Sequence, residues 1–94
     1  MEKQSERAVI AVIGKDTIGI LAKVSSICAR NRVNVMEVTQ SILQDLFVMI
    51  MLVDISGCTI PFSQLSDQFT AAGSDMNLKI HVMHEDIFNS MHRI

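Results

Sequence analysis

A chain of 94 residues is long enough for one domain with a single hydrophobic core. Hydrophobic residues make up 49% of it and aromatic residues only 4%, so the core is predicted to be aliphatic and rich in methionine. The formal charge of −2 and the scattered Lys and Arg residues argue against direct nucleic-acid binding, because they form no basic stripe.

The two cysteines, Cys28 and Cys58, form no Cys-x-x-Cys pair and follow no signal-peptide pattern. We therefore expect two buried thiols in a reducing cytoplasm. The longest apolar run, 46–53, is far below the ~18 residues that suggest a membrane span, so we expect a soluble protein that does not bind membranes.

The first element is predicted to be a buried strand over 9–13, followed by a tight polar loop and a helix from about Thr17 to Asn31. Asp16 or Thr17 is expected to cap that helix. Gly19 leaves the backbone bare where the N–H groups of a first helical turn point outward, which suits a carboxylate or another small anion. The alternative is that Gly14 and Gly19 serve only a sharp turn and close packing.

The middle of the chain is predicted to form a hairpin. A strand with a polar second half begins near Arg32 and ends at Leu43, and Gln44-Asp45 supplies the turn. The next strand, 46–53, is apolar on both faces, which is typical of a central position in a sheet.

A second amphipathic helix is predicted after Pro61. Its stripe runs from Phe62 to Ala72, and Gly73 is expected to end it. The strand predicted over 76–84 alternates between apolar Leu78, Ile80 and Val82 and the more polar Lys79, His81 and Met83, as a half-buried edge strand does.

The predicted order β-α-β-β-α-β indicates an α+β, ferredoxin-like sandwich. Two right-handed crossovers place both helices on one face of a four-stranded antiparallel sheet, with the first and third strands in the middle. We expect one domain over 1–94, with a core over 8–84 and a tail over 85–94. The helix-free face is expected to expose a broad apolar surface unless something covers it.

The tail is predicted to be a short helix because Ile87, Phe88, Met91 and Ile94 share one helical side. A helix of about ten residues is not stable alone, so it must dock on its own sheet or on a second copy of the chain, making a homodimer.

Two motifs in this order resemble an ACT domain. They are Gly14-Lys15-Asp16-x-x-Gly19-Ile20-Leu21 after the first strand and Val33-Asn34-Val35 at the second strand, and the resemblance spans 8–84. The ending His84-Glu85-Asp86-Ile87-Phe88 is similar to that of small stand-alone ACT proteins related to the glycine-cleavage repressor type.

The resemblance implies a regulatory module that binds amino acids near a dimer interface and is not a catalyst. The ligand would meet Gly14, Lys15, Asp16, Thr17, Ile18 and Gly19 of one chain and Asn34 of the same or a neighbouring chain. Amino-acid-binding members often carry a neutral amide where this chain has Asp16 and a polar side chain where it has Gly14. Asp16 would repel a ligand carboxylate, so it is expected to hold an ammonium group or only to cap the helix.

Other chemistry is not favoured by the sequence. His81, His84, Glu85 and His92 are the residues that suit a metal, but a strand would point His81 and His84 to opposite faces, so no metal or other cofactor is predicted. No nucleophile stands beside a base in a recognisable pattern. The alternative function is a protein-interaction module that uses the apolar sheet face or a strand edge and takes no small ligand.

Overall fold

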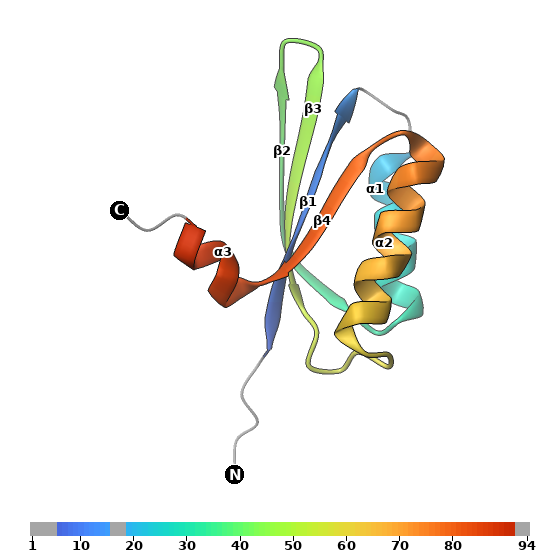
Figure 1. Ribbon diagram of the computed structural model, residues 1–94, viewed down its shortest axis with the longest axis vertical. Helices are drawn as coiled ribbons and strands as arrows, with labels where there is room; N and C mark the ends of the chain where they lie inside the picture. The colour runs from blue at the N-terminus through green and yellow to red at the C-terminus, as the bar shows by residue number, and fades with distance from the viewer. Residues whose placement is uncertain (1–5, 16–18, 92–94) are drawn as a thin grey trace.

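The computed structural model describes residues 6–15 and 19–91 and contains seven elements (Figure 1). In chain order they are β1 (Arg7–Lys15), α1 (Ile20–Arg30), β2 (Asn34–Leu43), β3 (Leu46–Asp54), α2 (Phe62–Met76), β4 (Lys79–His84) and α3 (Glu85–Met91). The predicted order β-α-β-β-α-β with a short C-terminal helix is confirmed.

The four strands form one antiparallel sheet in the order β2-β3-β1-β4. The two strands predicted to be central, β1 and β3, do lie in the middle. Helices α1 and α2 cover one face, and α3 lies on the other side of the sheet (Figure 1). The fold is therefore the predicted ferredoxin-like sandwich, and the face opposite α1 and α2 is called the open face below.

The core lies between the sheet and α1 and α2. Alternate residues of the central strands point into it, and the register pairs Ile10 with Met51 and Val12 with Met49, all with no exposed surface. Among the described aromatic side chains, only that of Phe69 in α2 is fully buried. The aliphatic, methionine-rich core is thus as predicted.

Helix α1 begins later than predicted. Its N-cap is Gly19, in the left-handed region with φ 87°, so the capping position belongs neither to Asp16 nor to Thr17. Residues 16–18 lie outside the described residues. Leu21 is 41% exposed because the buried stripe of α1 follows Ile20, Val24 and Ile27.

Helix α2 does not end at Gly73, as predicted, but continues to Met76. Asn77 ends it in the left-handed region with φ 58°, and β4 starts only at Lys79. Gly73 has a packing role instead. A Cβ at this position would lie 2.8 Å from the carbonyl oxygen of Leu78, which brings the helix close to the start of β4.

Helix α3 docks on its own sheet, one of the two expected arrangements, and contacts β1 and β4. Arg7 Nε donates to Glu85 Oε1 at 2.9 Å, and Arg7 Nη2 lies 2.7 Å from Glu85 Oε2. A two-point guanidinium–carboxylate contact therefore fixes the first turn of α3 to the start of β1. Among the described residues, the helices are all too short or too polar to cross a membrane.

Candidate functional site

The loop after β1 has two well-placed glycines in the structure. Gly14 is level with Phe47 in the sheet, and the side chain of Leu78 packs directly over its bare backbone. Gly19 has nothing within 4 Å of a Cβ built on it, and its φ of 87° is what requires glycine. Close packing therefore explains Gly14 and backbone conformation explains Gly19, in agreement with the alternative that the two glycines serve packing and a turn.

Lys15 is the charged residue at the described start of this loop. Its ammonium lies 3.9 Å from Asp45 in the hairpin turn, and both side chains are more than four-fifths exposed. The first turn of α1 contains no acidic side chain, so the outward N–H groups there are not opposed by a carboxylate of that turn.

Asn34 lies at the other end of the sheet. Asn34 pairs with Asp54 of β3, and Asp54 pairs with Arg7 at the start of β1. Gly14 is near the end of β1. Seven residues of extended strand separate the two levels, roughly 24 Å at about 3.4 Å per residue. Within one chain, Asn34 therefore cannot touch a small molecule held by Gly14 and Lys15.

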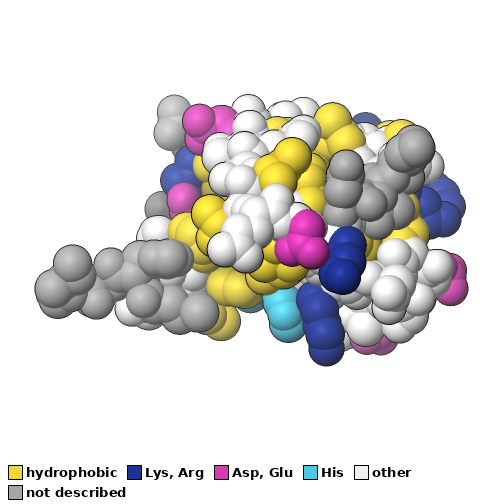
Figure 2. All heavy atoms as spheres, turned by 90° about the horizontal axis from the view of Figure 1, so that it is seen from above, with side chains coloured by type: hydrophobic (Ala, Val, Ile, Leu, Met, Phe, Trp, Pro, Cys, Tyr) yellow, Lys and Arg dark blue, Asp and Glu magenta, His cyan; other side chains and the backbone are white. Residues whose placement is uncertain are grey.

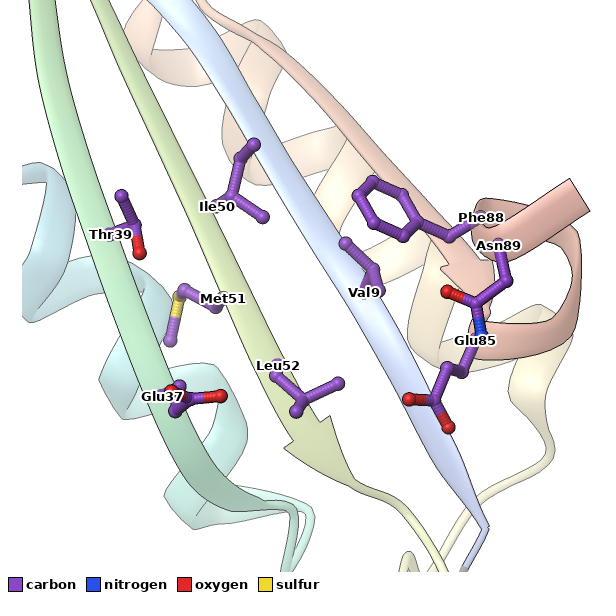
Figure 3. A pocket seen from close by; sticks show the side chains of 9 residues that line it. All are labelled: Val9, Glu37, Thr39, Ile50, Met51, Leu52, Glu85, Phe88 and Asn89. Atoms are coloured by element: carbon purple, nitrogen blue, oxygen red, sulfur yellow. The ribbon is translucent and has the colours of Figure 1, made fainter. Parts of the chain in front are cut away.

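A cavity lies on the open face, between β2 and α3 (Figure 3). It measures about 230 Å³, and Val9, Ile50 and Leu52 line it from the central strands. Glu37 and Thr39 of β2 stand on one side, and Glu85, Phe88 and Asn89 of α3 stand on the other. The sequence pattern predicted an apolar open face and placed Phe88 on the apolar side of the tail and Glu85 among possible metal ligands, but it did not group the lining residues into one site.

A β-bulge in β2 is the reason why the residue pattern did not predict this cavity. The register shift between Val35 and Glu37 leaves Met36 as an extra residue in β2, and the next residues, Glu37 and Thr39, then share the open face with Leu52 and Ile50. A bulge of this kind shifts which side chains share a face, and no simple alternation of residue types reveals it.

Within the part of the chain that the structure describes, Cys28 is the group whose pKa clearly departs from its ordinary value. Burial and, to a smaller extent, the neighbouring Cys58 together raise the pKa of the Cys28 thiol from 9.0 to about 11. Cys28 is buried as expected, but Cys58 is only half-buried. A thiol with a raised pKa is a poor nucleophile at neutral pH.

The histidines are separated as the strand geometry predicted. The ring of His84 stacks on Phe62 with centroids 4.1 Å apart, and its Nδ1 lies 3.7 Å from Glu6 Oε2, whereas His81 is exposed on the open face. Among residues 6–15 and 19–91, no three His, Cys, Asp or Glu side chains are grouped so as to hold a metal ion. His92 lies outside the described residues.

The family is decided by comparison with known proteins. A family model described as the ACT domain matches residues 6–83. The chain belongs to the ACT domain family. Membership supports a regulatory module that binds a small ligand.

Several relatives resemble this ACT domain over nearly their whole length. A UPF0237 protein of Methanocaldococcus jannaschii is 44% identical over 94% of this chain and 98% of its own length. A UPF0237 protein of Clostridium perfringens is 49% identical over 93% of this chain and 98% of its own length. The chain is therefore similar to small proteins that consist of one ACT domain.

Solved structures agree with the fold. An ACT domain protein from Streptococcus pneumoniae superposes with a TM-score of 0.78 at 34% identity, covering 90% of this chain and 96% of that one. A putative glycine cleavage system transcriptional repressor superposes with a TM-score of 0.72 at 17% identity, covering 87% of this chain and 47% of that one. The second likeness is one of fold alone.

Proposed function

We propose that this ACT domain is a non-enzymatic regulatory module that binds an amino-acid-like metabolite between two copies of the chain. The loop from Gly14 to Gly19 of one copy and Asn34 of the other would form the site. The observation that supports the proposal is the strand register, because it separates Asn34 from Gly14 within one chain, so a small ligand that contacts both would lie between two copies.

The outer edge of β2 offers a route for that second copy. β2 is an edge strand whose residues beyond Val35 are all exposed, and apolar Val38, Ile42 and Leu43 are 39%, 65% and 67% exposed. An exposed apolar edge strand favours pairing with another strand. Seen from the hairpin end, hydrophobic side chains lie on the surface among polar ones (Figure 2).

Antiparallel pairing of two β2 edges would place the start of one strand beside the end of the other. Asn34 of the second copy would then lie beside Leu43 of the first, three strand spacings or roughly 14 Å from the backbone of Lys15 at about 4.8 Å per spacing, a gap that the two side chains and the ligand together would bridge. The composite site would combine a Lys15 ammonium for a ligand carboxylate with an Asn34 amide that can both donate and accept hydrogen bonds. Asp16 is proposed to hold the ligand ammonium group.

The test is thermal unfolding at constant protein concentration against a panel of free amino acids and related small acids. A ligand at about one hundred times its dissociation constant stabilises the folded state by ~2.7 kcal/mol, which raises the midpoint by roughly ten degrees. The shift should disappear in Asn34→Ala and persist in Gln64→Ala, an exposed amide on α2. A flat panel would contradict the proposal.

A second candidate function is protein interaction without a small ligand. The exposed apolar residues of the hairpin and Ile50 of the open face, which is 37% exposed, favour it. A flat ligand panel together with loss of self-association on changing these residues would support this alternative.

A further inference from the structure

The cavity on the open face has a chemical character of its own. Its apolar floor is made by Val9, Ile50 and Leu52, and Ile50 is 37% exposed although it lies on a central strand. Figure 3 shows the Phe88 side chain extending from α3 toward Val9. An apolar floor with an aromatic wall and a few polar groups around it is the usual form of a small-molecule site.

Of the two carboxylates that line this cavity, one is paired with a cation and the other is paired with none among the described residues. The Glu85 carboxylate is already bound at both oxygens by the Arg7 guanidinium, so this pair contributes no net charge. Glu37 is exposed and is in no ion pair within the described part of the chain. The carboxylate that remains for a ligand is therefore that of Glu37.

We propose that this cavity binds a small primary amine that carries a branched aliphatic or aromatic group. Its ammonium would donate to the Glu37 carboxylate and to the hydroxyl of Thr39, two residues further along the same face of β2. Its apolar group would cover Ile50 and Leu52 beside Phe88. Asn89 on the opposite side can bond a further polar group of the ligand.

The basic residues of the open face do not oppose this assignment. Arg7 is engaged by Glu85, Lys15 lies eight residues further along β1, and Lys79 and His81 lie on β4. Since β4 is three strands away from β2, their backbones are roughly 14 Å from that of Glu37 at about 4.8 Å per strand. Exposed charges at that separation are largely screened at ordinary ionic strength, where the screening length is about 8 Å.

The size of the cavity selects a small occupant. The distance from β2 to β1 is two strand spacings, about 10 Å. A helix with its side chains is about 10–12 Å across, so a helix is too wide for this gap. Helix α3 also stands out from the open face, so a flat sheet of a second copy would meet α3 before it reached Ile50 (Figure 1). A volume of about 230 Å³ is below the range of drug-sized sites, about 300–1,000 Å³, and suits a small metabolite.

This inference does not depend on the proposed function. The cavity lies at the level of Val9, which is five residues along β1 from Gly14. Val9 pairs with Leu52, and Leu52 pairs with Glu37; none of these three residues belongs to the loop site. Failure of the amino-acid panel would therefore leave it intact.

The experiment is a nuclear magnetic resonance titration of the full chain with 3-methylbutylamine. Two matched compounds, 3-methylbutan-1-ol and 3-methylbutanoate, keep the apolar group and change the charge. We expect the amine to shift the amide signals of Thr39, Ile50 and Asn89 in a saturable way, the alcohol to bind about tenfold more weakly, and the acid to leave these signals unchanged.

The variant Glu37→Gln keeps the shape of the side chain and removes its charge, so it should weaken amine binding about tenfold. Asp67→Asn, a charge removal on an exposed position of α2, should leave the affinity unchanged. Equal affinity for amine and alcohol, shifts confined to other residues, or an unaffected Glu37→Gln variant would each overturn the proposal. So would a dependence of the same signals on protein concentration, because that would mean that a second copy fills the cavity.

Discussion

Gly73 is the residue at which local preference and packing conflict most directly. Alanine is favoured over glycine by about 1 kcal/mol inside a helix, yet a Cβ here would lie 2.8 Å from the Leu78 carbonyl oxygen and 3.2 Å from Ile80 Cγ1. Since a backbone oxygen cannot rotate away, the fit between α2 and β4 depends on the missing side chain.

We expect Gly73→Ala to lower the free energy of unfolding by about 1–3 kcal/mol, as overpacking does. Urea denaturation measures it. Gly57→Ala is the control, because a Cβ there would make only an ordinary contact of 3.7 Å with the Arg32 carbonyl oxygen. A more stable Gly73→Ala protein would mean that the helix and strand move apart without cost.

Cys28 predicts a pH dependence. Its folded-state pKa of about 11 lies above its ordinary value of 9.0, so the folded state holds the thiol proton more tightly than the unfolded state does. The resulting stability is present in full below pH 9 and is lost as the pH rises toward about 11. Denaturation at a series of pH values should show this fall in the wild type and a shallower one in Cys28→Ala; parallel curves would contradict the assignment.

At the scale of elements, the Arg7–Glu85 ion pair ties the first turn of α3 to the start of β1. The Arg7–Glu85 pair is partly exposed, with side-chain exposures of 38% and 25%, so its contribution to global stability is expected to be below 1 kcal/mol. Its local effect should be larger, because α3 has only seven residues and contacts only β1 and β4 among the described elements.

We therefore expect Arg7→Gln and Glu85→Gln each to speed amide hydrogen exchange in α3 while leaving exchange in β3 unchanged. A double-mutant cycle on the exchange rates isolates the pair. Asp45→Asn, which alters the exposed contact of 3.9 Å with Lys15, is the matched control and should leave α3 unaffected. Unaltered exchange in the Arg7 and Glu85 variants would show that packing of Phe88 alone holds the helix.

For the whole molecule, the strand order decides which surfaces are available to a second copy. β2 lies at one edge and presents Val38 with 39% exposure, while Ile87 is 54% exposed on α3, which contacts β1 and β4. If two copies join through β2, Val38→Lys should lower the association constant at least tenfold and Ile87→Lys should not. Sedimentation equilibrium measures both, and equal effects would point to a different interface.

Element types and their order could be predicted from residue patterns, because apolar periods of two and of about 3.6 residues are local properties. The apolar character of both faces of 46–53 also indicated its central place in the sheet, since such runs are typical of strands with a neighbour on each side, although Ile50 on the open face is 37% exposed. Element ends were less predictable. Gly73 is typical of a helix end, but close contact with β4 keeps it inside α2, and Gly19 rather than Asp16 or Thr17 is the N-cap of α1.

The fold, the tail helix and the resemblance to the ACT family could be predicted from the residues of the chain, because they depend on local pattern and on motifs with fixed spacing. The folded structure was needed to place Asn34 and Gly14 at opposite ends of the sheet, since strand register is a relation between distant segments. It also decided that Glu37, Ile50 and Phe88 share one cavity. These residues come from three elements, and a β-bulge and the direction of α3 bring them together.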